Sequence, residues 1–310
     1  MEDELWNGLY PVILEEHSRR PRRKRVRFSD AVILSVALWA ILHDRPISWA
    51  CRAQNWPGGC PPWASLPSPA TMSRRLRTLS VQVLLEQVFY RLLHATHALE
   101  GLCLCRRIDS KPLPVGGFTK DRDARRRGYA TGGLARGYKL FACWLCVGDT
   151  VVPEALMLGP MCESDPAGTR ELIDRLLVSH PDGPVGGYVL ADVTDDSNPL
   201  HAYVTARGFQ LVTPRKQPGT GLGHGSDHEP GRLHAIELLE GPDPSSLTFG
   251  PTLYGLRETI ERDFGNAGSF GGGLQPLPNF VRRPRRVALW VIGKLLINGI
   301  RICEKHGVTP

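Results

Sequence analysis

The stretch "LCLCRRID", Leu102–Asp109, marks a change from helical to strand-type sequence. It is an apolar, β-type run that ends in charged residues. Two further runs of this type follow, "YKLFACWLCVG" (Tyr138–Gly148) and "TVVPEALML" (Thr150–Leu158). The short gap between these two predicts an antiparallel hairpin. A sheet is therefore expected to begin at Leu102.

Helices and strands alternate beyond this hairpin. The pattern predicts helices at Asp165–His180 and Ser197–Gly208, and strands at Gly186–Asp192 and Phe209–Pro214. A hairpin followed by helix–strand–helix–strand predicts an α/β fold, with a mixed sheet flanked by helices. A loop at about 214–232, a helix containing Tyr254 and a helix at Arg285–Ile302 complete the chain.

The first hundred residues predict a separate, all-α and basic module. Ser29 and Asp30 are suited to cap a helix at Ala31–His43, and Val81–His97 has strong amphipathic spacing. The segment Ser18–Arg27 carries seven Lys and Arg and no acid, which suits either a solvated linker or contact with phosphates. We therefore expect a DNA-binding module at 1–100 and a catalytic domain at 101–310.

Composition favours a polyanionic partner and excludes a membrane-spanning protein. The 310 residues contain 38 Lys and Arg against 31 Asp and Glu, a formal net charge of +7. The longest apolar run, Ala31–Leu42, is shorter than the roughly 17–25 residues that cross a bilayer. No signal peptide is visible at the N-terminus. Nucleic acid and a cytoplasmic location are expected.

Eight cysteines without a secretory signal favour reduced thiols over a disulfide framework. The motif "CWLC", Cys143–Cys146, resembles a zinc or redox motif. In a strand, however, residues three apart point to opposite faces, so core packing is the stronger interpretation. Cys105 is likewise expected in the core.

Two aspartates are notable for their positions. Asp109 follows the strand at Leu102 and Asp192 ends the strand at Gly186, where sites form in open α/β sheets. Glu261, on a late helix, is a third carboxylate from a distant segment. Converging carboxylates repel one another, and divalent cations relieve that repulsion. Taken singly, each aspartate also suits a simple turn after a strand.

Tyr254, Arg257 and Glu261 lie three and four residues apart in "LYGLRETIERDFG". On an α-helix they would share one face. The simple interpretation is a solvated stripe with an ordinary ion pair between Arg257 and Glu261. The functional interpretation places the carboxylate beside groups that bind DNA.

A basic, Gly-rich segment, Thr119–Lys139, interrupts the predicted strands. It suits a disordered surface loop and a DNA-binding segment about equally. In the second case its cations follow the DNA backbone, and binding would weaken steeply with added salt. The cations concerned are Arg125, Arg126, Arg127 and Lys139.

Several motifs, in this order, resemble the DDE transposases of bacterial insertion sequences, groups four and five. The similarity covers roughly Leu102–Arg301, and the helical N-terminus weakly. The motifs are "RRIDSKPLPV", "GYKLFACWLCVGDTVVPEALMLGP", "YVLADVTDDSN", "YGLRETIERDFG" and "VALWVIGKLLINGIR". The most specific is the family pattern of Tyr, two residues, Arg, three residues, Glu, six residues and Lys. Tyr254, Arg257 and Glu261 match it.

The resemblance implies a ribonuclease-H-like fold and a transposase. Asp109, Asp192 and Glu261 would hold two Mg²⁺ ions, with Mn²⁺ able to substitute. The enzyme would cut double-stranded DNA at the element's terminal inverted repeats, and the freed 3′-hydroxyl would attack target DNA. Arg257 and Tyr254 would hold the DNA end. A homodimer on DNA and a nucleoid-associated location in the cytoplasm are expected.

Two departures from the family pattern leave alternatives open. Gly268 stands where the family has Lys, and Thr194-Asp195 stands where it commonly has Gly-Tyr. A relative that binds DNA but has lost its chemistry is the first alternative. A ribonuclease-H-like nuclease with no mobile element is the second.

Overall fold

The chain forms two compact units. The computed structural model describes residues 2–21, 26–59, 62–97, 104–116, 121–124, 127–130, 132–147, 150–179, 186–218, 222, 228–241, 244–260, 264–265, 274 and 277–310. One unit joins Met1–Leu99 with Gly265–Pro310, and the other is Glu100–Phe264. Residues 265–310, which we expected with the sheet, group with the N-terminal helices.

The first unit is helical, as the sequence predicts. Its α-helices are α1 (Glu2–Ser18), α2 (Asp30–Leu42), α3 (Ile47–Ala50), α4 (Pro69–Arg75), α5 (Leu79–His97) and α11 (Pro284–His306). Short 3₁₀ helices, η1 (Ala53–Asn55) and η2 (Pro57–Gly59), follow α3.

Helix α2 is the centre of this unit. It starts after Ser29, whose hydroxyl accepts a hydrogen bond from the Val32 N–H at 3.2 Å, so the predicted cap is confirmed. Every residue of α2 is buried, because α1, α4, α5 and α11 all pack against it. Even so, no helix among the described residues is long and apolar enough to cross a membrane.

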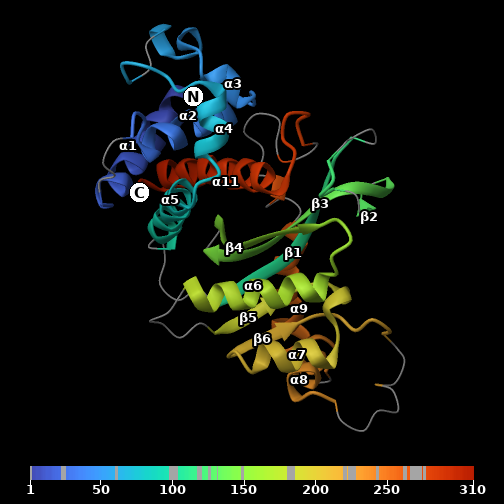
Figure 1. The fold of residues 1–310 in the computed structure, drawn as a ribbon. Helices are drawn as coiled ribbons and strands as arrows, with labels where there is room; N and C mark the ends of the chain where they lie inside the picture. Colours follow the sequence, from blue (N-terminus) through green and yellow to red (C-terminus); the bar gives the residue numbers. More distant parts are fainter. Residues whose placement is uncertain are drawn as a thin grey trace. The chain divides into compact units, whose positions relative to one another are not determined.

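The second unit contains a mixed, six-stranded sheet (Figure 1). Strand β3 pairs antiparallel with β1, β2 and β4, whereas β1, β5 and β6 are parallel neighbours. The predicted α/β class and mixed sheet are therefore confirmed. The strands are β1 (Cys105–Pro114), β2 (Arg127–Ala130), β3 (Gly133–Val147), β4 (Thr150–Pro160), β5 (Gly187–Leu190) and β6 (Phe209–Val212).

Helices cover both faces of the sheet. On β5, Val189 packs in a core cluster with α6 (Asp165–Ser179) and α7 (Asn198–Thr205). Its neighbour Leu190 packs in a second cluster with α8 (Pro230–Glu240) and α9 (Pro244–Gly255). Because successive strand residues point to opposite faces, the two clusters lie on opposite sides of the sheet. Helix α8 begins inside the segment that we expected to be a loop to residue 232.

The expected helix around Tyr254 differs in one respect. Tyr254 lies in the last turn of α9, but Arg257 lies in a 3₁₀ helix, η4 (Leu256–Thr259). Gly255 stands at the junction, and glycine is a poor residue for continuing an α-helix. Tyr254 and Arg257 therefore do not share the stripe of one regular α-helix.

Candidate functional site

Asp109 and Asp192 lie at the same level of the sheet. Strands β1 and β5 are in parallel register, with Cys105 opposite Tyr188 and Arg107 opposite Leu190. Continuing this register by two residues places Asp109 opposite Asp192. Neighbouring strands are about 4.8 Å apart. The two aspartates that the sequence singled out are thus brought together.

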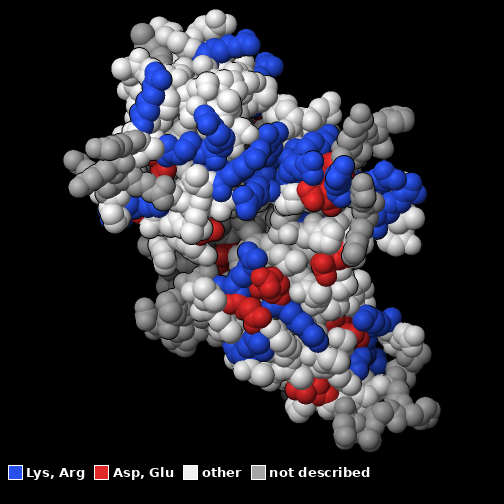
Figure 2. Space-filling model, in the orientation of Figure 1, with Lys and Arg blue, Asp and Glu red and all other residues white. Residues whose placement is uncertain are grey.

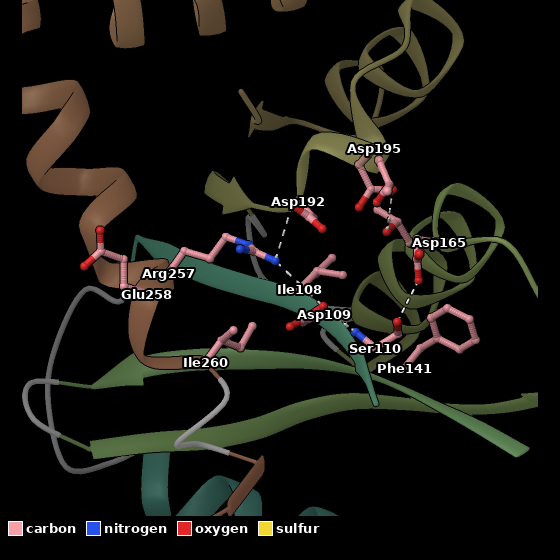
Figure 3. Close-up of a pocket in the computed structure, with 12 residues that line it drawn as sticks. Ile108, Asp109, Ser110, Phe141, Asp165, Asp192, Asp195, Arg257, Glu258 and Ile260 are labelled. Carbon is pink, nitrogen blue, oxygen red and sulfur yellow. Dashed lines mark hydrogen bonds and ion pairs between the residues drawn. The ribbon is translucent and has the colours of Figure 1, made fainter. Parts of the chain in front are cut away.

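The sheet opens beside these aspartates because β5 is short. It ends at Leu190, whereas β1 continues to Pro114 and remains paired with β3, with Asp109 opposite Ala142. A cavity of about 450 Å³ fills the space that β5 leaves. Its walls include four aspartates, Asp109, Asp165, Asp192 and Asp195 (Figure 3).

Arg257 lies close to both carboxylates of the Asp109–Asp192 pair. Its Nη2 lies 3.8 Å from Asp109 Oδ1 and 3.9 Å from Asp192 Oδ1. Both distances exceed those of a well-formed hydrogen bond, so the guanidinium attracts both carboxylates without binding either tightly. Figure 3 shows it reaching toward the two from η4.

The negative charge of Asp109 is only partly offset by its neighbours. Burial raises its pKa to about 6, and the charges of Asp192 and Asp165 act in the same direction. The Ser110 N–H, which donates to Asp109 Oδ1 at 2.8 Å, and Arg257 offset only part of this rise. A metal ion at this position would relieve both the burial cost and the repulsion.

Asp195 belongs to the same electrostatic cluster. Its pKa is raised to about 7, first by burial and then by the charge of Asp165, with smaller effects from Asp192 and Asp109. The Thr169 hydroxyl donates to Asp195 Oδ1 at 3.2 Å, which counteracts the rise in part. The departure at Thr194-Asp195 therefore adds an acid to the cavity itself.

Asp165 is a cavity residue that the sequence analysis missed. It is the first residue of α6, where an acid is favourable at any helix N-terminus, so its position gave no specific signal. Its Oδ1 accepts a hydrogen bond from Ser110 Oγ at 2.7 Å and lies 2.7 Å from Lys139 Nζ. Lys139, expected at the DNA backbone, is thus engaged with an acid of the cavity wall.

Tyr254 supports the end of β5. Its hydroxyl donates to the carbonyl oxygen of Ala191 at 3.2 Å, immediately before Asp192. Arg107 of β1 donates to the carbonyl oxygen of Leu256, the first residue of η4. These two contacts connect the α9–η4 segment to the strands that carry the aspartates.

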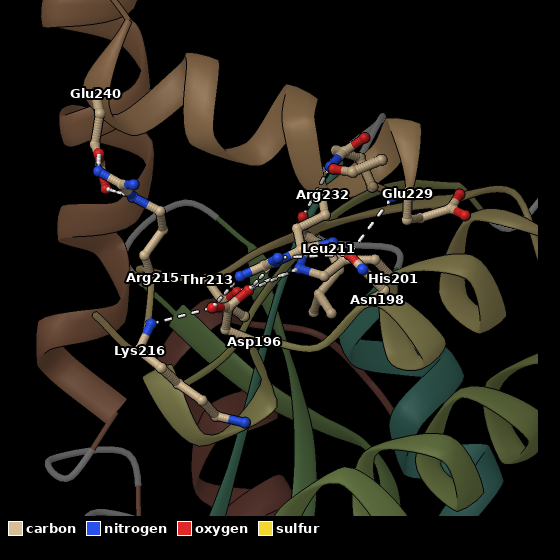
Figure 4. Close-up of polar contacts among 12 residues, drawn as sticks. Asp196, Asn198, His201, Leu211, Thr213, Arg215, Lys216, Glu229, Arg232 and Glu240 are labelled. Carbon is tan, nitrogen blue, oxygen red and sulfur yellow. Dashed lines mark hydrogen bonds and ion pairs between the residues drawn. The ribbon is translucent and has the colours of Figure 1, made fainter. Parts of the chain in front are cut away.

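Asp192 and Asp196 stand at the two ends of one short turn, and a polar network around Asp196 holds that turn in place (Figure 4). Asp196 accepts hydrogen bonds from Arg232 Nε at 2.6 Å, Arg232 Nη2 at 2.9 Å and the Lys216 N–H at 3.0 Å. Burial alone would raise the pKa of Asp196, but these bonds bring it below its usual value. Asp196 thereby links the turn that follows β5 to α8.

His201 completes this network. Its Nε2 lies 3.4 Å from Thr213 Oγ1 and 3.9 Å from Asp196 Oδ1. Burial lowers the pKa of His201 to about 4, so the ring is neutral at pH 7. We assign it a structural role, because it packs inside the fold and does not line the cavity.

Several predicted site residues cannot be placed. Glu261, Arg125, Arg126 and Gly268 lie outside the described residues. Ile260, which precedes Glu261, is buried and lines the cavity. Arg127 is exposed in β2, whose residues pair with the start of β3, and it does not line the cavity. Within the basic segment, Arg127–Ala130 thus pair antiparallel with Gly133–Arg136.

Asp109 and Asp192 are two cavity carboxylates that could hold a metal ion. Within the described ranges, no three Asp, Glu, His or Cys side chains are grouped so as to hold a metal ion. Mg²⁺ commonly uses only one or two protein carboxylates, and water or phosphate oxygens complete its octahedron. Asp109 and Asp192 therefore fit the expected ion.

Comparison with family models, with curated proteins and with solved structures gives no match to this chain. The site's geometry and the sequence motifs are therefore the basis for assigning a function.

Proposed function

We propose that this protein is a DDE transposase that cuts and joins DNA with the help of divalent metal ions. The observation that carries the proposal is the placement of Asp109 and Asp192 side by side in one cavity. The mixed sheet, with antiparallel strands on one side, two parallel strands on the other and helices on both faces, supports a ribonuclease-H-like fold.

Asp109 and Asp192 would hold the metal, together with Glu261, the third ligand that the resemblance implies. Bound there, Mg²⁺ would supply an activated water and stabilise the leaving oxygen of a phosphodiester. Both aspartates carry one fixed hydrogen bond, Ser110 N–H to Asp109 Oδ1 and Val193 N–H to Asp192 Oδ1. These bonds orient the carboxylates and leave oxygen lone pairs available.

Arg257 would exchange partners during the reaction. In the structure it is shared between two carboxylates at long distance. With a metal ion held by these carboxylates, the guanidinium would be available to donate charge-assisted hydrogen bonds to a DNA phosphate. Tyr254 would position Asp192 through the Ala191 carbonyl, a role different from the nucleotide contact that we expected.

The helical unit would supply further DNA contacts. Figure 2 shows Lys and Arg side chains gathered on one face of it. Exposed arginines of this unit include Arg74 and Arg77 near α4, and Arg285 and Arg286 in α11. Such a surface suits a polyanionic backbone. Because transposition joins two element ends, we propose that the protein acts as a dimer on DNA.

The direct test uses the DNA on both sides of the coding region. A transposase predicts imperfect inverted repeats there, and Mg²⁺-dependent nicks at their ends that leave a 3′-hydroxyl. The full chain is incubated with a linear fragment carrying both flanks, with Mg²⁺ or with EDTA, beside Asp192→Asn. Binding without Mg²⁺-dependent nicking would instead identify a DNA-binding relative, and cleavage at arbitrary positions a nuclease.

A further inference from the structure

Two cysteines face each other across the β1–β3 ladder. In this antiparallel pair, Arg106 lies opposite Leu145, and the next residues outward are Cys105 of β1 and Cys146 of β3. Neither cysteine is in a disulfide, and both are partly exposed. The two side chains are hydrogen-bonded to each other, so they project from the same face of the sheet.

The motif "CWLC" had suggested a different pair. Cys143 is fully buried and belongs to the core cluster under α6 and α7. Cys105 instead packs beside the cluster under α8 and α9, on the opposite face. The partner of Cys146 is therefore Cys105, which is 41 residues away in the sequence and adjacent in the sheet.

We propose that Cys105 and Cys146 form a reversible cross-strand disulfide when the protein meets a peroxide. Directly opposed residues of an antiparallel pair have Cα atoms about 4.5–5.5 Å apart. This separation lies within the range of about 4.4–6.8 Å that disulfides require. The bond can thus close without moving either strand far. The proposal does not depend on the function proposed above.

The chemistry balances with hydrogen peroxide as the oxidant. One thiolate attacks the peroxide, which is reduced to water, and becomes a sulfenic acid. The second thiolate attacks that sulfur and expels a second water, which leaves the disulfide. The neighbouring thiol is already in contact, so the second step is fast and the sulfenic acid does not accumulate.

The first step is expected to be slow. The hydrogen bond with Cys146 and burial raise the pKa of Cys105 well above its usual value, although Arg107 and Arg106 counteract this in part. Little thiolate is then present at neutral pH. Exposed Cys162 is expected to react earlier, so the disulfide marks prolonged or strong oxidation.

The test oxidises the native, full-length chain with hydrogen peroxide over several hours and then blocks the remaining thiols with N-ethylmaleimide. Mass spectrometry of a non-reduced digest should show the Cys105 and Cys146 peptides linked, about 2 Da below their summed thiol masses. Dithiothreitol should separate them. Oxidation should also raise the Tm by several degrees, because the link closes a loop of about 40 residues.

Two variants make the result decisive. Cys162→Ser should form the link at the wild-type rate, whereas Cys146→Ser should form none and show no rise in Tm. The proposal is overturned if Cys105 and Cys146 are both recovered with N-ethylmaleimide after exhaustive oxidation of the folded protein. A link that forms only in denaturant, or that joins either cysteine to Cys162, would overturn it as well.

Discussion

Asp196 with Arg232 and Asp109 with Arg257 are two aspartate–arginine pairs near the same turn. The pKa of the aspartate is shifted in opposite directions in the two pairs. Asp196 is bound by two Arg232 nitrogens at 2.6 and 2.9 Å, and its pKa is lowered. Asp109 meets Arg257 only at 3.8 Å, and its pKa is raised to about 6. The residue types are the same, but the distance and number of hydrogen bonds differ.

This difference distinguishes an ion pair that stabilises the fold from carboxylates that are suited to bind a cation. A buried carboxylate that is fully hydrogen-bonded has little to gain from another cation. A partly buried carboxylate whose charge is only partly offset, and which lies beside other acids, is destabilised by burial and repulsion. A bound metal ion would remove that cost. We therefore propose that the Asp196 pair stabilises the fold and that the Asp109–Asp192 pair binds a metal ion.

The largest expected effect is on catalysis. Asp109→Asn and Asp192→Asn should each reduce Mg²⁺-dependent cleavage of flanking DNA at least about 10³-fold, or ~4 kcal/mol, because each removes a metal ligand. Initial rates on end-labelled fragments measure this. Asp174→Asn, which alters a half-exposed aspartate outside the cavity, is the matched control and should cleave normally. Wild-type rates in both cavity variants would mean that the assignment is wrong.

The next effect is on stability and concerns the structural pair. Arg232→Met should lower the free energy of unfolding by about 3–5 kcal/mol, because Asp196, whose side chain is 2% exposed, stays charged and loses its arginine while keeping the Lys216 N–H. Arg257→Met should cost under about 1 kcal/mol, since its ion pairs are long. Urea denaturation measures both values. Equal losses would remove the distinction between the two arrangements.

A smaller effect of opposite sign is expected from Asp109→Asn in metal-free protein. The folded pKa of Asp109, about 6, lies above its usual value of 3.8, so its contribution favours folding below pH 4 and is lost as the pH rises through 6. At pH 7 the variant should be more stable than wild type by about 1–3 kcal/mol. Unfolding at pH 4 and pH 7 tests this, and a variant destabilised at pH 7 would contradict it.

The smallest effect concerns the proposed transfer of Arg257 from the two carboxylates to a DNA phosphate. Arg257→Gln should raise the affinity of DNA-free protein for Mn²⁺ about five- to tenfold, or ~1 kcal/mol, because it removes a competing cation. The same change should weaken DNA binding. Metal titration and DNA binding at two salt concentrations measure the pair of effects. A variant that binds Mn²⁺ more weakly would show that Arg257 supports the metal site and does not compete for it.

The sequence predicted the fold class and the meeting of two aspartates. Alternating apolar runs predicted the strands, and the rule that sites form after strand ends selected Asp109 and Asp192. Both predictions depend on local patterns and on one general property of parallel strands. For that reason they needed no knowledge of distant contacts.

The remaining cavity residues could not be predicted in this way. Asp165 enters the cavity because α6 packs over the sheet, and no local pattern records that packing. Asp195, three residues after Asp192, was noted in the sequence only as a departure from the family pattern. Arg232 meets Asp196 across 36 residues, through a helix that we took for the end of a loop. The break at Gly255 moved Arg257 off the expected helical stripe and into a 3₁₀ turn.

Mn²⁺ titration followed by electron paramagnetic resonance shows whether Asp109 and Asp192 together bind a divalent cation. At pH 7 the wild-type, DNA-free protein should bind Mn²⁺ saturably, and the affinity should fall as the pH drops below about 6, where Asp109 takes up a proton. The variant with both Asp109→Asn and Asp192→Asn should not bind. Saturable binding that is unchanged in this double variant, or its absence from the wild type, would contradict the claim.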